Sequence, residues 1–136
     1  MQIMKVSMSF DFVLRLLSAL GDDSVLEKTG DLSRRLQIPY NHLIKIVHQL
    51  YKHKIVITKK GRYGGVCLAQ SARELSLADL YQLFEHGRVY SCLADPESCH
   101  LYKGCRIMPV YSEMEQAFKQ VLAQRRIKDI IRNEKG

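Results

Sequence analysis

Three of the chain's four cysteines, Cys92, Cys99 and Cys105, lie in the polar stretch SCLADPESCHLYKGCR, residues 91–106. Thiolates bind soft metal ions and react with oxidants, so a cluster of thiols suggests a metal site or a redox site. The sequence has no apolar run long enough to span a membrane and no secretory signal, so we expect a cytoplasmic protein. In that reducing compartment, clustered cysteines are more often ligands or reactive thiols than disulfide partners.

The spacing of these cysteines differs from that of the common zinc sites. Structural zinc sites usually pair ligands roughly two to four residues apart, and the gaps between these cysteines are longer. His100 could supply a fourth zinc ligand, although its place next to Cys99 makes simultaneous binding awkward. An iron–sulfur cluster accepts wider loops, and three thiolates leave one iron open to a different ligand. Three exposed thiols without a cofactor are disfavoured, because such thiols are readily oxidised.

Positive charge is concentrated in one segment of the chain. The net charge is +7, and residues 28–62 hold nine Lys or Arg residues with Asp31 as their only acid. The charges of the remaining residues nearly cancel. A field concentrated in this way is typical of proteins that bind a polyanion, most simply nucleic acid. A solvated basic face that binds nothing is the alternative that charge alone leaves open.

The periodicity of apolar residues places much of this charge on a pair of helices. Residues 7–20 are expected to form a first helix with one apolar stripe. A short helix should follow at residues 31–36, capped by Thr29 or Asp31, and a third at residues 40–52 after a turn that contains a proline. Two short helices around a tight turn form a helix-turn-helix.

After the third helix the pattern changes to short β-like runs. Residues 55–58 and 66–68 flank a basic, glycine-rich loop at residues 59–65, which predicts a hairpin. A helix-turn-helix followed by a basic hairpin is the plan of a winged-helix domain.

Two more helices are expected in the second half of the chain. Residues 75–87 form a helix that Ser76 caps and Gly87 ends. Residues 107–130 form a last, long helix with an apolar face. A helix of this kind often pairs with its twin in a dimer, although packing on its own domain explains the pattern equally well.

These elements predict a mostly α fold with three parts. Residues 1–87 form a winged helix-turn-helix DNA-binding domain, residues 88–104 form a cysteine-rich cluster-binding loop, and residues 105–136 form a long C-terminal dimerisation helix with a tail.

The outward face of the third helix carries side chains that can read DNA. The second helix of a helix-turn-helix lies in the major groove. Asn41 and Gln49 can hydrogen-bond to base edges, and Tyr40, His42 and Lys45 can reach bases or phosphates. The hairpin tip could enter the minor groove, where arginine is attracted and glycine lets the backbone come close. The candidate residues of the tip are Lys59, Lys60, Arg62 and Gly64.

Four stretches, in order along nearly the whole chain, carry a family resemblance. They are MKVSMSFDFVLRLL (4–17), YNHLIKIVHQL (40–50), KGRYGGVCLA (60–69) and CLADPESCHLYKGCR (92–106). Together they resemble the signature sequences of the Rrf2 family, dimeric winged-helix iron–sulfur regulators of bacteria that include IscR and NsrR. The second stretch is closest to the nitric-oxide-sensing NsrR branch.

The resemblance implies a set of cluster ligands. In the NsrR branch, three cysteines and an aspartate of the partner subunit's first helix hold a 4Fe–4S cluster, and Cys92, Cys99, Cys105 and Asp11 match these positions. The IscR branch instead uses a histidine three residues after its last cysteine, where this chain has Met108. A 2Fe–2S cluster remains the alternative, because the first cysteine gap is one residue longer than in most of the family.

The resemblance also implies a function. We expect a homodimeric regulator of transcription, most simply a repressor, that binds an operator in double-stranded DNA and loses affinity when nitric oxide or another oxidant attacks its cluster. The alternatives are a 2Fe–2S regulator that senses iron or redox state, and a regulator that uses zinc or a thiol switch. An iron–sulfur enzyme is not expected, because the sequence has no catalytic acid–base set and no substrate-binding motif.

Overall fold

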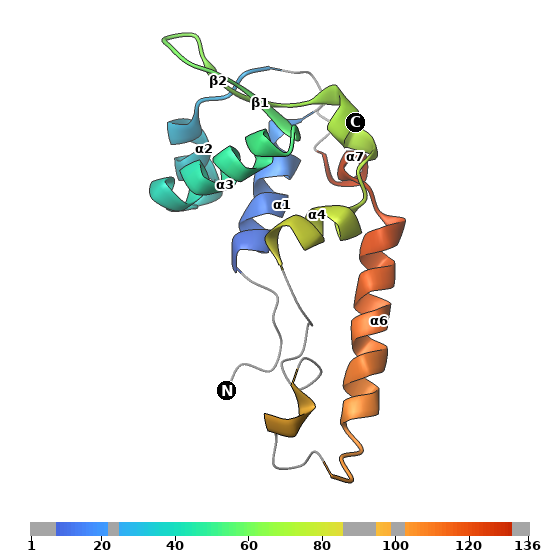
Figure 1. Ribbon diagram of the computed structural model, residues 1–136. Coiled ribbons are helices and arrows are strands. Elements are labelled where there is room, and N and C mark those ends of the chain that lie inside the picture. Colours follow the sequence, from blue (N-terminus) through green and yellow to red (C-terminus); the bar gives the residue numbers. More distant parts are fainter. Residues whose placement is uncertain (1–7, 22–24, 86–94, 99–102, 132–136) are drawn as a thin grey trace. The chain divides into compact units, whose positions relative to one another are not determined.

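Figure 1 shows the computed structural model, which describes residues 8–21, 25–85, 95–98 and 103–131. The contacts divide these residues into two units. We call the first the helix-turn-helix unit; it comprises the described residues of 8–75 and 126–131. The second, the α4–α6 unit, comprises the described residues of 76–125. Helices dominate both units, and one two-stranded sheet lies in the first, which confirms the predicted mostly α, winged-helix fold.

Three helices build the centre of the helix-turn-helix unit: α1 (Met8–Leu20), α2 (Thr29–Leu36) and α3 (Tyr40–Lys52). Helix α3 has the predicted bounds. Each helix contributes fully buried leucines to a shared core, among them Leu16, Leu32 and Leu43. Burial of one leucine side chain stabilises a fold by about 1.5–3 kcal/mol, so this core alone holds the three helices together.

The start of α2 differs from the prediction that Thr29 or Asp31 caps it. Lys28 occupies the N-cap position, and its side chain makes no capping hydrogen bond. Asp31 lies inside the first turn instead, where the positive end of the helix dipole stabilises its negative charge. Its carboxylate pairs with Arg34 of the same helix, so it is used within α2 rather than as a cap.

The turn between α2 and α3 is closed by polar contacts. Gln37 has a left-handed backbone with φ of 55°, and its N–H donates to the carbonyl of Arg34. The Ser33 hydroxyl donates to the Ile38 carbonyl at 2.6 Å, and the Ile38 side chain is buried. This turn fixes the direction in which α3 leaves α2.

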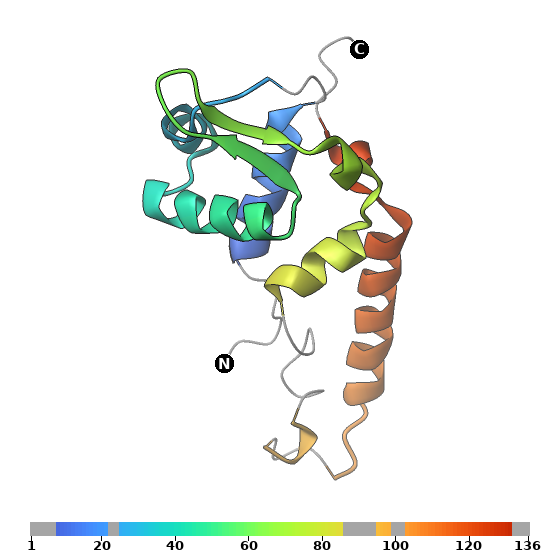
Figure 2. The ribbon, with the colours of Figure 1, turned by 45° about the horizontal axis from the view of Figure 1, so that its top comes forward.

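The predicted hairpin consists of β1 (Val56–Lys59) and β2 (Gly65–Leu68), which pair in antiparallel register from Val56 opposite Leu68 to Lys59 opposite Gly65. We call the hairpin with its loop the wing. The wing loop, α2 and the beginning of α3 lie on the same side of this unit (Figures 1 and 2). The wing is therefore placed where one ligand could touch it and α3 together.

The predicted last helix, 107–130, is interrupted. Helix α6 (Met108–Gln124) ends before Arg125 and Arg126, whose backbones are extended, and a short helix α7 (Ile127–Ile130) follows. Ile127 is fully buried in the helix-turn-helix unit, where its N–H donates to the Leu75 carbonyl at 3.0 Å. The chain is thus drawn out of the helix by a tertiary contact, which overrides the good helix propensity of arginine.

The α4–α6 unit contains α4 (Leu77–Phe84), α6 and a short 3₁₀ helix, η2 (Pro96–Ser98). The predicted cap is correct, since the Ser76 hydroxyl accepts a hydrogen bond from the N–H of Asp79 at 3.1 Å. Helix α4 ends at Phe84; the predicted stop at Gly87 lies outside the described residues. The rings of Tyr81 and Phe118 pack edge to face with centroids 5.4 Å apart, which joins α4 to α6. None of the helices described in the chain is long and apolar enough to cross a membrane.

Candidate nucleic-acid interface and cluster site

The outward face of α3 presents most of the predicted DNA-reading side chains to solvent. Tyr40, Asn41, Lys45 and Gln49 are exposed, because the opposite face of the helix is buried in the core. These side chains offer an amide donor and acceptor at two positions, a phenol and an ammonium group. Such groups can hydrogen-bond to base edges in a major groove and pair with phosphates beside it.

His42 differs from its neighbours on α3, because its ring is turned toward α1. Its Nε2 lies 3.1 Å from the Ser9 hydroxyl, and its ring meets the ring of Phe12 edge to face at 5.0 Å. The side chain is half-buried. A contact between His42 and DNA stays a prediction, whereas in the free chain the ring connects α1 to α3.

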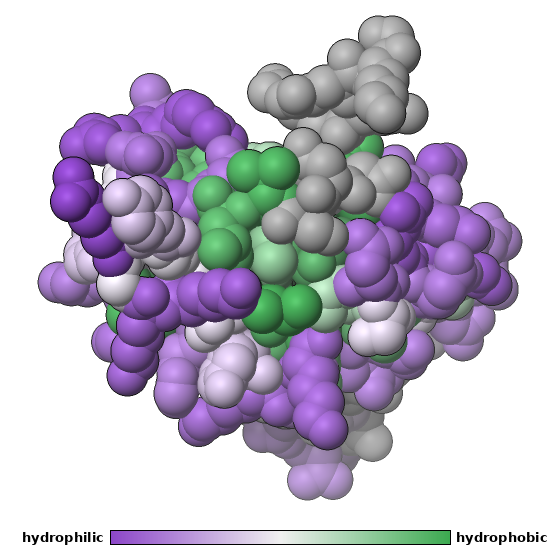
Figure 3. Space-filling view, turned by 90° about the horizontal axis from the view of Figure 1, so that it is seen from above, coloured by the Kyte–Doolittle hydropathy of each residue, from purple (hydrophilic) through white to green (hydrophobic). Residues whose placement is uncertain are grey.

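The wing carries three exposed basic residues at its tip, Lys59, Lys60 and Arg62, as predicted for a DNA contact. Gly64 is buried, and a Cβ atom there would lie 2.1 Å from the Lys59 carbonyl oxygen. Only glycine fits this position, so the hairpin itself explains Gly64. Figure 3 looks onto the end of the unit that bears the wing and shows hydrophilic residues around the wing loop.

Two residues at the wing escaped the sequence analysis. Tyr63 is 85% exposed at the tip, with the Arg62 guanidinium 5.8 Å from its ring centroid. Lys28 was counted only as charge, yet its Nζ donates to carbonyls of the wing loop. An aromatic residue between arginine and two glycines was the signal for Tyr63, whereas no sequence signal marks the contact of Lys28.

Of the predicted cluster ligands, Cys105 and Asp11 lie within the described residues, while Cys92 and Cys99 lie outside them. Cys105 has a free, partly exposed thiol. The Asp11 carboxylate is about half exposed and pairs with Arg15 at 2.7 Å. Across the residues that the structure describes, no group of three metal-binding side chains comes together. An accessible thiol and an accessible carboxylate still fit the donor set of an iron–sulfur cluster shared between two chains.

Arg15 connects Asp11 to the helix-turn-helix. Besides its ion pair with Asp11, Arg15 donates to the Leu36 carbonyl at the end of α2, at 3.4 Å, and its guanidinium lies over the ring of Phe12. A change in what the Asp11 carboxylate binds would therefore alter the partners of Arg15 at the turn before α3.

The fourth cysteine is of a different kind. Cys67 is buried in β2 opposite Ile57, with 5% of its surface exposed. A buried thiol in a strand behaves as a small apolar side chain. Cys67 thus differs from Cys105 in that its thiol is buried, whereas the thiol of Cys105 is partly exposed.

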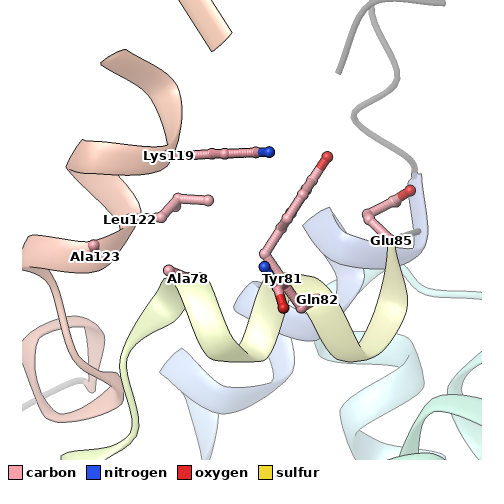
Figure 4. A pocket seen from close by; sticks show the side chains of 7 residues that line it. All are labelled: Ala78, Tyr81, Gln82, Glu85, Lys119, Leu122 and Ala123. Atoms are coloured by element: carbon pink, nitrogen blue, oxygen red, sulfur yellow. The ribbon is translucent and has the colours of Figure 1, made fainter. Parts of the chain in front are cut away.

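The α4–α6 unit has a cavity of about 450 Å³ between helices α4 and α6. Lys119 of α6 and Tyr81 of α4 extend across the opening, and Ala78, Leu122 and Ala123 form an apolar side (Figure 4). Burial raises the pKa of the Tyr81 phenol, and nearby carboxylates add to this rise. The Tyr81 hydroxyl therefore stays protonated and can both donate and accept hydrogen bonds.

Comparisons with known proteins agree with this arrangement. The model of a family described as "Rrf2: Iron-dependent Transcriptional regulator" matches residues 6–133. An HTH-type transcriptional regulator NsrR from Shouchella clausii is 33% identical over 135 residues, which cover 96% of this chain and 91% of the relative. A protein of the same name from Oceanobacillus iheyensis is 33% identical over 128 residues, covering 91% of this chain and 87% of the relative.

Solved structures with a similar fold are more distant in sequence. CymR, the global cysteine regulator of B. subtilis, superposes with a TM-score of 0.70 at 15% identity, over 94% of this chain and 96% of that one. IscR from T. potens gives a TM-score of 0.64 at 17% identity, over 93% and 85% of the two chains. At these identities the likeness concerns the fold.

Proposed function

The chain belongs to the Rrf2 family of DNA-binding transcriptional regulators, which are not enzymes, and on this premise we propose that it is a homodimeric repressor controlled by an iron–sulfur cluster. It would act in the cytoplasm on an operator with two half-sites, one for each subunit. The observation that carries the proposal is the coincidence of an accessible thiol in the cysteine stretch, an exposed carboxylate on α1 and an exposed reading face on α3.

The DNA contact of each subunit would use α3 and the wing. Tyr40, Asn41, Lys45 and Gln49 would face the major groove, and the wing tip with Arg62 would reach the adjacent minor groove. The concentrated charge of residues 28–62 supports this proposal, because phosphate contacts supply much of the affinity of such proteins.

The second copy would pair along α6. Four apolar side chains of this region, about half exposed, follow a spacing of three, four and seven residues: Ile107, Val110, Met114 and Val121. The exposed Ala117 fills the gap in the pattern. Alternating steps of three and four residues form the seam of a helix that packs against a second helix. The face that carries Phe118 and Leu122 packs within the α4–α6 unit, whereas the seam residues are about half exposed, which supports pairing of two subunits along the seam.

Four ligands would hold the cluster: Cys92, Cys99 and Cys105 of one subunit and Asp11 of the other. We favour a 4Fe–4S cluster, because relatives named NsrR match over nearly the whole chain. The cluster supplies an iron that nitric oxide or an oxidant can attack. A carboxylate is a hard ligand on a soft, sulfur-rich cluster, so Asp11 would be the most exchangeable ligand. Once released, Asp11 would be free to pair with Arg15, which also contacts the Leu36 carbonyl next to the turn before α3.

The test compares two cysteines of the same chain. DNA duplexes are first selected from a random pool with the anaerobically prepared parent protein. Affinity for the selected duplex is then measured with and without a nitric oxide donor. We expect the donor to change the affinity of the parent at least about tenfold, which corresponds to a coupling within the usual range for allosteric proteins.

The variants decide the outcome. Cys105→Ser should bind the duplex with an affinity that the donor no longer changes, whereas Cys67→Ala should respond like the parent, because Cys67 is buried away from solvent. A Cys105→Ser protein that responds to nitric oxide like the parent would refute the proposed sensing mechanism and leave the DNA-binding function standing.

A further inference from the structure

The segment that joins α1 to α2 forms part of the wing. Glu27 pairs with Val66 of β2 through two backbone hydrogen bonds of 2.9 and 2.8 Å, as a third strand would. The approach is close, since a Cβ atom at Gly65 would lie 2.5 Å from the Glu27 carbonyl oxygen. The wing is therefore fixed along one edge by a segment whose Glu27 precedes its partner Val66 by 39 residues.

Lys28 extends this attachment to the tip of the wing. Its Nζ donates to the carbonyl of Arg62 and lies 3.4 Å from the carbonyl of Gly61. On the other side, the Glu27 carboxylate pairs with Arg35 of α2 at 2.8 Å. Two adjacent side chains thus tie the wing loop and α2 to the same short segment. Charge alone would assign Lys28 to a DNA phosphate, but its ammonium group is already engaged by the protein.

The residues held in this way are a pair suited to a groove of DNA. Tyr63 is 85% exposed, and the Arg62 guanidinium lies over its ring. Arginine enters narrow minor grooves, and apolar side chains can insert as wedges between the base steps of a minor groove. A loop that is already ordered loses less conformational entropy on binding than a mobile one. Anchoring the Arg62 and Gly61 carbonyls therefore favours a tip that is ready to bind.

We propose that Lys28 is a positioning residue of the wing and that Tyr63 is the aromatic DNA contact that it holds in place beside Arg62. The proposal rests on the DNA-binding function and assigns different roles to two basic residues. Lys60 contacts phosphate, whereas Lys28 acts through the wing loop and makes no phosphate contact of its own.

The salt dependence of binding separates the two roles. The slope of log affinity against log salt concentration is negative, and removal of one phosphate contact reduces its magnitude by about 1. We expect Lys60→Met to show this change. Lys28→Met, which removes the same charge and keeps a similar stem, should weaken binding to the selected duplex about tenfold at every salt concentration and leave the slope within about 0.3 of the parent value. A slope whose magnitude decreases by about 1 in both variants would make Lys28 a phosphate contact and overturn the proposal.

Trypsin digestion tests the positioning role without DNA. The wing tip offers cleavage sites after Lys59, Lys60 and Arg62. Loss of the Lys28 contact should speed cleavage there severalfold in Lys28→Met and not in a Lys52→Met control, whose lysine is exposed at the end of α3. Equal cleavage rates in parent and Lys28→Met would show that Lys28 does not order the loop, and would contradict the proposal.

Tyr63 is tested by a pair of substitutions. Tyr63→Ser should weaken binding about tenfold, because the ring is no longer buried in the groove, and Tyr63→Phe should keep most of the affinity because it keeps the ring. Tyr63 is almost fully exposed, so neither change should alter the thermal unfolding midpoint of the free protein. Parent-like affinity of Tyr63→Ser would remove Tyr63 from the DNA contact. Parent and variants are compared in the same anaerobic preparation and without the nitric oxide donor, so the results for Lys28 and Tyr63 are distinguishable from the outcome of the nitric oxide test.

Discussion

The helix-turn-helix unit and the α4–α6 unit differ in how much of their apolar surface their own residues bury. In the first, each of three helices contributes fully buried leucines, and backbone hydrogen bonds connect Glu27 to the wing. In the second, α6 buries only Glu115 and Leu122 along its length and leaves the seam of Val110, Met114 and Val121 in solvent. We propose that the first unit reads DNA through a surface that is already ordered in the free chain. The second has an open apolar face, which we assign to a second copy of the chain.

The largest effect is expected in the core of the helix-turn-helix unit. Leu43→Ala removes a fully buried side chain of α3 and should lower the free energy of unfolding by about 3 kcal/mol. Ile44→Ala, one residue along the same helix but 39% exposed, should lower it by less than about 1 kcal/mol. Urea denaturation gives both values. Equal losses would show that the unit lacks the closed core that distinguishes it from the α4–α6 unit.

The next effect concerns the open face of α6. Met114→Lys places a charge in the exposed seam and should weaken dimerisation by about 2 kcal/mol, close to 30-fold in the dissociation constant, because the charge would lose its hydration in the interface. Gln116→Lys adds the same charge at an exposed position of α6 off the seam and should leave the dimer intact. Sedimentation equilibrium measures both constants. A parent-like Met114→Lys dimer would place the interface elsewhere.

A smaller effect is expected at the beginning of α4. Ser76→Ala removes the hydroxyl that accepts the N–H of Asp79 and should cost about 1 kcal/mol of stability. Ser76→Asp should restore most of it, because a carboxylate caps a helix equally well. Thermal unfolding followed by circular dichroism measures the change. If Ser76→Ala unfolds like the parent, then the cap does not limit the stability of the more open unit.

The smallest effect involves Glu74, which pairs with Arg126 and Lys128 beside α7. The hydrogen bond from Lys128 is the main cause that lowers the pKa of Glu74. A carboxyl group with a lowered pKa stabilises the folded state above its usual pKa of about 4.3, and this contribution disappears as the pH falls through the lowered value. Glu74→Gln should therefore lower the unfolding midpoint slightly near neutral pH and not at all in strong acid. The same difference at both pH values would exclude a role for the charge.

Much of the helix-turn-helix unit follows from local sequence signals. Helix α3 has the predicted bounds because its apolar period is regular and Pro39 precedes it, and the wing follows from two β-like runs around a glycine-rich loop. Two features of the unit did not follow. Lys28 contacts the wing loop, and the chain leaves its last helix at Arg125. Both depend on contacts between residues far apart in the sequence, which periodicity and propensity do not reveal.

The residues of the candidate site also differ in whether local sequence signals could predict them. Residue type and spacing singled out Cys105, whose thiol is partly exposed, and the apolar period of α3 predicted which of its side chains face solvent. The inward turn of His42 toward Ser9 could not be predicted, since a histidine at that position is equally compatible with either direction. Asp11 was identified by family resemblance alone, and its pairing with Arg15 is a feature that the spacing of four residues on a helix explains afterwards.

We propose that Cys92, Cys99 and Cys105 hold an iron–sulfur cluster, and the most direct test of this proposal is the composition of the anaerobically purified protein. Iron, acid-labile sulfide and zinc are measured per chain together with the visible spectrum. We predict about four irons, about four sulfides and a broad absorbance near ~400 nm. About two irons with structured bands at longer wavelength would replace the 4Fe–4S cluster by a 2Fe–2S cluster. A colourless protein that holds zinc without sulfide, or that stays free of metal after reconstitution is attempted, would contradict the proposal.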